Sequence, residues 1–282
     1  MVINLFKYTT KKTLTFGVAG AVGALVGSGC TEFFLASGSS GIGGTILHVA
    51  IWTGIISLGI ALALLTTQNL YLKKAVFSKA ILNAGFRGIL AGGIAGGIAQ
   101  IVFFYTATIS TPVEIISRII CWGIFGLGTG WGISKFVPNY PQRTAMIAGF
   151  LGGVIGGAAF RFSLNYLPEQ VSRLLGVAIV GFFIGLMISY IEELFREAWL
   201  TVIWGKDEKT SISLGTKPIV LGSSSEADIY LPKEKGFPPI TAIIKLNNSK
   251  VVIDNKINNQ TTELRNGSKI MLGSIEVIIN TK

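Results

Sequence analysis

The chain has 282 residues, of which 50% are hydrophobic, 13% are charged and 36 are glycine. This composition, with a mean hydropathy of +0.61, is typical of membrane proteins and excludes an ordinary soluble domain and a disordered chain. The net charge is +10, but the basic residues before Trp199 form short clusters between apolar runs, which argues against a nucleic-acid partner. The two cysteines show neither a disulfide framework nor zinc-ligand spacing.

Six apolar runs in the first part of the chain approach the roughly 20 residues needed to cross a bilayer. They cover 14–35, 45–65, 88–106, 115–133, 145–162 and 174–191. Every proline before residue 200 lies between runs, where its missing N–H interrupts no spanning helix. We therefore predict an all-α transmembrane domain of six helices over 1–190, surrounded by membrane lipid.

Lysine and arginine are unevenly distributed among the connections between these runs. The N-terminal tail, the second-to-third connection and the fourth-to-fifth connection contain nine of them, and the alternate connections contain three. Because basic connections stay on the cytoplasmic side, we predict a multi-pass protein of a bacterial-type inner membrane with both termini in the cytoplasm. A basic start, an apolar stretch and Cys30 also leave open a lipoprotein-type signal, in which Cys30 would be lipidated.

Glycines recur at intervals of four within the apolar runs. In lipid, such glycines form a groove in which another backbone approaches closely, the arrangement called a glycine zipper. The predicted packing positions are Gly93, Gly97, Gly126, Gly130, Gly153, Gly157, Gly181 and Gly185. The strings "AGGIAGGIA" and "LGGVIGGAA" also align with each other, as do "EIISRIICWGIFGLGTG" and "EQVSRLLGVAIVGFFIG". We therefore predict three hairpin repeats in a compact bundle, with glycine faces left over for a homo-oligomer.

Two acid–base pairs begin the fourth and sixth runs. Glu114 and Arg118 are four residues apart, as are Glu169 and Arg173, which predicts ion pairs at the outer interface with each carboxylate near a helix N-terminus. The alternative is a channel or transporter with a charged path. Its polar groups inside the membrane would be Ser57, Gln100, Thr106 and Thr129. The sequence contains no HExxH, GxSxG or Walker-type motif, so we predict neither an enzyme nor a bound cofactor or metal.

The character of the chain changes near residue 199. The string "YIEELFREAWL" at 190–200 predicts that the sixth helix continues as a stalk over 191–199, since Glu192 and Arg196 are four residues apart. From Leu200 on, short runs rich in β-branched residues alternate with glycine, asparagine, serine and proline. These runs predict eight or nine strands in an all-β sandwich or barrel.

Three landmarks in this region resemble the forkhead-associated (FHA) family over about 200–282. They are "IVLGSSSEADIYLP", "FPPITAIIKL", and "LRNGSKIMLG" with a closing "IEVII". The resemblance implies an FHA-like β-sandwich that binds a protein partner, in this family usually through phosphothreonine. It also implies that the family's phosphate-binding arginine, second-landmark serine and bracing histidine correspond to Ser223, Pro238 and Thr241.

The loss of that arginine bears directly on function. A doubly charged phosphate needs a cation or several converging N–H donors, and Ser223 offers one neutral hydroxyl. Lys233 and Lys235 on the neighbouring loop are the candidate replacements. We predict a scaffold or adaptor whose bundle displays a cytoplasmic, phosphate-independent FHA-like domain in a larger membrane complex. The alternatives are a channel or transporter regulated by this domain and a phosphothreonine-dependent receptor.

Overall fold

The computed structural model describes residues 2–34, 41–76, 79–163, 169–205, 208–247, 250–273 and 275–282, with the backbone alone for 2–10, 32–34, 163, 169 and 170. The chain forms two compact units. The first unit consists of Met1–Thr67, Ser78–Phe136 and Pro141–Glu192, and the second of Gln68–Phe77, Val137–Tyr140 and Glu193–Lys282.

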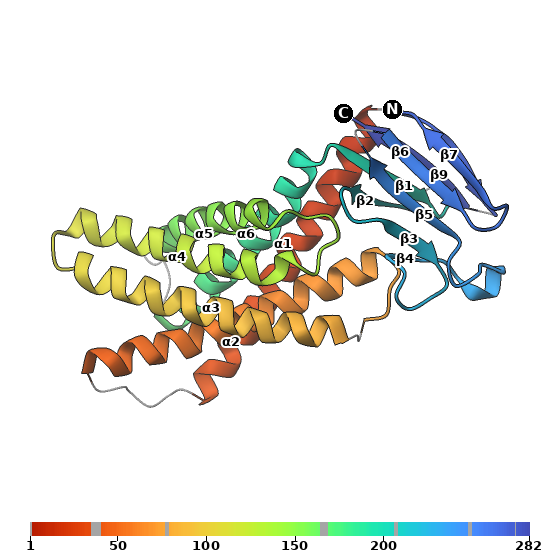
Figure 1. Cartoon of the computed structure of the whole chain (residues 1–282). Coiled ribbons are helices and arrows are strands. Elements are labelled where there is room, and N and C mark those ends of the chain that lie inside the picture. Colours follow the sequence, from red (N-terminus) through yellow and green to blue (C-terminus); the bar gives the residue numbers. More distant parts are fainter. Residues whose placement is uncertain are drawn as a thin grey trace. The chain divides into compact units, whose positions relative to one another are not determined.

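Six helices account for nearly all of the first unit (Figure 1). They are α1 (Val2–Phe34), α2 (Gly41–Tyr71), α3 (Lys79–Thr106), α4 (Thr111–Ser134), α5 (Gln142–Ser163) and α6 (Glu169–Phe195). Each of them contains a stretch that is long and apolar enough to cross a membrane. Each predicted apolar run lies within one helix, except for residue 35, which is outside the described residues. The six apolar helices of the prediction are confirmed.

The outward face of α3 consists of large apolar side chains. Leu82, Phe86, Leu90, Ile94 and Ile98 follow one another at intervals of four, and between 46% and 71% of each residue is exposed. The opposite face is buried and consists mainly of glycine and alanine. In water, a ridge of large exposed apolar side chains favours aggregation. In a hydrocarbon environment, exposing the same side chains carries no free-energy cost.

The helices of the first unit form a closed ring, because α1 contacts both α2 and α6. A Cβ atom on Gly23 of α1 would overlap the carbonyl oxygen of Gly59 in α2. A Cβ atom on Gly20 of α1 would overlap the carbonyl oxygen of Gly181 in α6. An ion pair also joins the two ends of the ring. The Nζ of Lys12 in α1 lies 2.7 Å from the Oε2 of Glu192 in α6, and both side chains are buried.

Three of the helix interfaces are built alike. At the α2–α3, α4–α5 and α6–α1 interfaces, a glycine of the first helix named faces the backbone of the second. The facing residues are Gly54 with Ile89, Gly126 with Gly149, and Gly181 with Gly20. Since a side chain at these glycines would meet a carbonyl oxygen of the partner helix, the distance between the helix backbones depends on the missing Cβ.

Most of the predicted packing glycines lie at such contacts. A Cβ would meet the backbone of a neighbouring helix at Gly126, Gly130, Gly153, Gly181 and Gly185. At Gly157 it would meet the side chain of Trp122, 2.8 Å from its Cβ.

The tight face of α3 differs from the predicted one. A Cβ on Gly97 would make only ordinary contacts, the nearest at 3.6 Å from the Cβ of Ala50, and one on Gly93 would lie 3.0 Å from the Ala50 carbonyl oxygen. The closest approach is one position earlier, where Gly92 and Gly96 are buried against the side chains of α2. Adjacent residues of a helix point about 100° apart. The string "GGIAGGIA" contains two glycine pairs four residues apart, Gly92 with Gly96 and Gly93 with Gly97, on two different faces.

An alanine at Gly149 is expected to destabilise the bundle, because its Cβ would overlap the carbonyl oxygen of Gly126 and force α4 and α5 apart. Overpacking of this kind costs about 1–3 kcal/mol, which should lower the midpoint of thermal unfolding of the purified chain in detergent. Gly29→Ala is the matched control, since a Cβ there meets no described atom within 4 Å. Equal midpoints for the two variants would contradict the close backbone contact.

Nine strands form the body of the second unit. They are β1 (Ala198–Ile203), β2 (Lys209–Leu214), β3 (Ile219–Gly222), β4 (Ile229–Tyr230), β5 (Ala242–Asn247), β6 (Lys250–Asn255), β7 (Gln260–Leu264), β8 (Lys269–Leu272) and β9 (Ile275–Thr281). One sheet has the order β2-β1-β9-β8 and the other β4-β3-β5-β6-β7. All neighbours are antiparallel except β3 and β4. Side chains from both sheets form one hydrophobic core, the arrangement of a β-sandwich.

The predicted stalk is helical only as far as Phe195, and its last residues belong to a strand. β1 begins at Ala198 and pairs with both β2 and β9. The two charged residues of the stalk prediction have other partners: Glu192 pairs with Lys12, and the Arg196 guanidinium stacks on Trp199 at 4.3 Å. An i,i+4 ion pair is worth only a few tenths of a kcal/mol, less than burying alternate residues of β1 in a core.

Candidate functional site

The loops of the first two FHA-like landmarks lie together at one end of β3. The backbone N–H of Ser223, directly after β3, donates to the carbonyl oxygen of Pro238 at 3.0 Å, and the N–H of Ser224 donates to that of Pro239 at 3.2 Å. A Cβ on Gly222 would overlap the Pro239 carbonyl oxygen, so only glycine permits this close approach. The β3–β4 and β4–β5 connections are thus fixed against each other, and Ser223 and Pro238 are neighbours.

Ser223 and Thr241, which the resemblance aligns with the phosphate-binding arginine and the bracing histidine, both make hydrogen bonds within the second unit. The Ser223 hydroxyl donates to the carbonyl oxygen of Phe237 at 2.9 Å. Thr241 is fully buried, and its hydroxyl donates to the carbonyl oxygen of Pro238 at 3.3 Å. Its backbone N–H donates to Leu221 at 2.8 Å. Thr241 therefore braces the β4–β5 loop, and both hydroxyl protons are directed at carbonyl oxygens instead of a ligand.

Lys233 and Lys235 occupy the 3₁₀ turn η1 (Lys233–Lys235) on the same β4–β5 connection. Both are exposed, and neither forms an ion pair with a described residue. Further along this connection, Ile240 leaves 45% of its surface exposed. The outward surface of the connection therefore combines two exposed cations, Lys233 and Lys235, with the apolar side chain of Ile240, and we call it the β4–β5 surface.

The predicted interfacial ion pairs have different outcomes. The Nη2 of Arg118 donates to the Oε1 of Glu114 at 2.9 Å within α4. Both side chains are more than a third exposed in the isolated unit, and such pairs are worth about 0–1 kcal/mol in water. The Arg118 guanidinium also lies 4.5 Å from the ring centre of Phe103. The predicted pair of Glu169 and Arg173 involves a side chain, that of Glu169, outside the described residues.

Three of the four polar residues considered for a transport path make hydrogen bonds within the helices. The hydroxyls of Ser57 and Thr129 are 3.1 Å apart, and both residues are fully buried between α2 and α4. The Thr106 hydroxyl donates to the carbonyl oxygen of Val102 at 2.8 Å. Gln100 lines a cavity, which is described below.

Two segments far from the strands in sequence complete the second unit. Leu72, which follows α2, is 1% exposed and belongs to the same core as the two sheets. Its carbonyl oxygen accepts a hydrogen bond from the N–H of Tyr230 at 3.3 Å. The hydroxyl of the adjacent Tyr71 accepts from the N–H of Ser211 at 2.8 Å. The sequence alone contains only a weak signal for this role, an isolated apolar residue before two lysines.

The second such segment is the turn between α4 and α5. Asn139 has a left-handed backbone, with φ of 53°, a conformation that asparagine tolerates better than most residues. Its side-chain amide donates to the carbonyl oxygens of Ser213 and Lys217 at 3.2 and 3.1 Å, and its Oδ1 accepts from the N–H of Lys217 at 3.0 Å. The β2–β3 connection is therefore fixed by a residue that lies some 75 positions earlier in the chain.

Comparison with known proteins yields two findings. No family model and no curated protein matches the chain. Among solved structures, it is similar to a chain from a study of phosphothreonine-dependent FHA domain interactions, with 20% identity, a TM-score of 0.26 and coverage of 31% of this chain and 98% of that chain. It is also similar to FHA-1 of Mycobacterium tuberculosis Rv1747, with 12% identity, a TM-score of 0.25 and coverage of 30% and 99%.

Proposed function

We propose that this chain is a membrane-anchored interaction protein. Its glycine-packed bundle lies in a bacterial-type inner membrane, with both termini in the cytoplasm, and its second unit is an FHA-like domain that binds a protein partner in a larger complex. One observation carries this proposal: helices with exposed apolar faces are joined in one chain to a two-sheet unit in which the first two FHA-like landmarks meet at the end of β3. Loops held on a rigid scaffold are a common place for recognition surfaces.

The geometry of the loops supports binding that does not depend on phosphate. Ser223 replaces the cation that a phosphate requires, and its proton is held by the Phe237 carbonyl oxygen. Thr241 is buried and unavailable to a ligand. The β4–β5 surface, with Ile240 exposed, instead offers apolar contact with a basic margin. A partner with an apolar anchor and acidic neighbours would complement it.

Site-specific cross-linking tests this surface in the full chain. A photo-cross-linking amino acid at Ile240 should yield one discrete adduct in cells that express the protein. The same amino acid at Met271, which is 62% exposed on β8 of the other sheet, is the matched control. Adducts of the same mass and yield at both positions, or at neither, would contradict a partner bound at the β4–β5 surface.

A second experiment separates this function from that of a phosphothreonine receptor. We expect threonine-phosphorylated peptides and their unphosphorylated counterparts to bind the detergent-purified chain equally or not at all, since no fixed cation faces the position of Ser223. Fluorescence anisotropy measures this directly. Phosphate-dependent binding that Lys233→Ala and Lys235→Ala abolish, while Lys245→Ala on β5 leaves it unchanged, would establish the receptor instead.

A further inference from the structure

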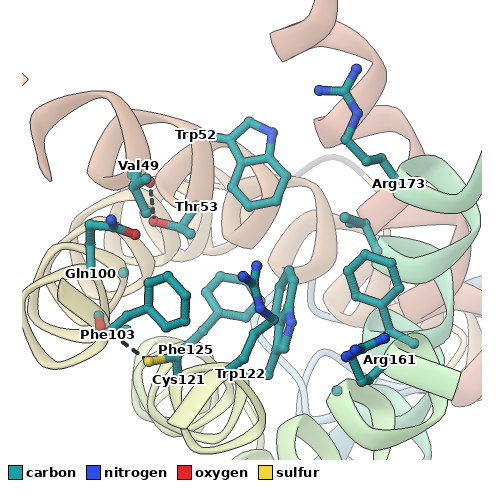
Figure 2. A pocket seen from close by; sticks show the side chains of 16 residues that line it. Val49, Trp52, Thr53, Gln100, Phe103, Cys121, Trp122, Phe125, Arg161 and Arg173 are labelled. Atoms are coloured by element: carbon teal, nitrogen blue, oxygen red, sulfur yellow. Dashed lines mark hydrogen bonds between the residues drawn. The ribbon is translucent and has the colours of Figure 1, made fainter. Parts of the chain in front are cut away.

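A cavity of about 280 Å³ lies inside the first unit. Its lining comes from five of the six helices, α2 to α6. Figure 2 shows that aromatic side chains dominate its walls. Trp52 and Trp122 meet edge to face, with ring centres 6.1 Å apart, and Phe125 and Phe160 contact the Trp122 ring at 5.9 and 5.8 Å. The interior of the cavity is therefore rigid and apolar.

Three arginines from three different helices line the same cavity. They are Arg118 of α4, Arg161 of α5 and Arg173 of α6. No acidic residue is among the described lining residues. Glu114 balances Arg118, but Arg161 has no hydrogen bond or ion pair with any described residue. Arg173 has an interaction of its own, so Arg161 is the lining cation without a described partner, and it lies beside an apolar wall.

The charged and apolar groups are also separated along the helices. Arg161 is two residues from the end of α5, and Arg173 is four residues from the start of α6. Trp122 and Phe125 lie 11 and 14 residues into α4, which begins at Thr111. Because α4 and α6 start at the end of the bundle where α3 and α5 finish, the arginines lie near one end, and Trp122 and Phe125 lie deeper.

We propose that this cavity binds an anionic lipid, with Arg161 holding the headgroup phosphate and the aromatic rings contacting the first part of one acyl chain. Guanidinium groups match phosphate oxygens in charge and geometry. The volume lies just below the usual range for small-molecule pockets, enough for a chain segment but not a whole lipid. Ordinary interfacial arginines and tryptophans surround a bundle, whereas these residues line one cavity between five helices.

This inference requires that the helices lie in a bilayer, as in the proposed function, but not that the second unit binds a protein. Flotation of the reconstituted protein with vesicles, measured first, separates the two. A chain that does not float contradicts the membrane placement itself, and only a chain that floats is used in the lipid experiment.

Tryptophan quenching in phosphatidylcholine nanodiscs provides the test. Phosphatidylglycerol with brominated acyl chains should quench saturably at a few mole per cent, and brominated phosphatidylcholine at the same level should not. The saturable part should be lost in the Trp52→Phe/Trp122→Phe variant, because those rings line the cavity. Inorganic phosphate should not displace the lipid, because it makes no contact with the apolar wall. Displacement by phosphate alone would overturn the lipid and indicate a soluble anion.

Matched variants connect the effect to Arg161. Arg161→Gln should weaken the apparent affinity for phosphatidylglycerol about tenfold or more. Arg143→Gln removes the same charge from the other end of α5, outside the cavity lining, and should leave the affinity unchanged. Val49→Phe, which fills the cavity but keeps every charge, should also weaken binding. Equal affinities in all variants, or equal quenching by both lipids, would overturn the proposal.

Discussion

Replacing Leu72 with alanine is expected to lower the free energy of unfolding of the second unit by about 2–5 kcal/mol. Leu72 is 1% exposed in the core shared by the two sheets, so its removal leaves a cavity among strand residues far away in sequence. Hydrogen exchange of the full chain in detergent measures the effect as lost amide protection in β3 and β5. The helices of the first unit should keep their protection, because Leu72 belongs to the second unit.

The control for this experiment is two residues away. Leu70→Ala removes the same side chain from a position that is 58% exposed, where substitutions usually change stability by less than about 0.5 kcal/mol. Equal loss of protection in the two variants would contradict the docking of Leu72. The same reasoning applies to truncation. A fragment that starts at Ala198 lacks both Leu72 and Asn139, so it should show weaker protection than the same strands in the full chain.

Replacing Lys12 with alanine is expected to cost the bundle about 3–5 kcal/mol, because the carboxylate of Glu192 would remain buried without its cation. The midpoint of thermal unfolding in detergent measures this loss. The paired substitution Lys12→Met/Glu192→Met should recover most of it, since exchanging a buried ion pair for apolar side chains is often neutral.

Lys11→Ala provides the comparison for Lys12. Lys11 is adjacent in sequence and has the same charge, but its side chain is exposed. If the Lys11 and Lys12 variants unfold at the same temperature, the buried ion pair does not hold α1 against α6. If the paired methionine variant is as unstable as Lys12→Ala, packing around the site, and not the unpaired carboxylate, accounts for the loss.

The helices were predictable because their signal is strong and local. Runs of about 20 apolar residues bounded by prolines leave few alternatives, and all six helices were expected. The glycine contacts were predictable in kind but not always in position. In α6 one pair of glycines, Gly181 and Gly185, has this spacing, whereas α3 carries Gly92, Gly93, Gly96 and Gly97, and the choice between its two pairs depends on which face α2 approaches.

In the second unit, some strands were predictable from the sequence and others were not. Strands that alternate apolar and polar residues, such as β1 and β9, were evident from the sequence. The sequence did not indicate β7 (Gln260–Leu264), because it is a polar edge strand in which only Leu264 is buried. The stalk prediction was wrong at its end, since a local charge spacing competed with burial of Ala198 and Leu200.

The sequence indicated some of the site residues and not others. The sequence indicated Ser223, Pro238 and Thr241 as one group, and the structure places them within hydrogen-bonding contact. It did not indicate Leu72 or Asn139, whose roles depend on contacts with residues some 75 or more positions away. The cavity arginines were expected as separate interfacial charges, and only the folded bundle brings all three to one cavity.

The contact between α1 and α6 has a consequence for biosynthesis. During synthesis and insertion, Gly20 and Lys12 emerge long before Gly181 and Glu192, the residues that they meet in the finished bundle. Until the five later helices have been made, α1 therefore lacks its contact with α6, and Lys12 lacks the carboxylate of Glu192. Transient cover by lipid headgroups or by the insertion machinery would protect it. A ribosome stalled before residue 180 should leave α1 accessible to reagents that the completed ring excludes.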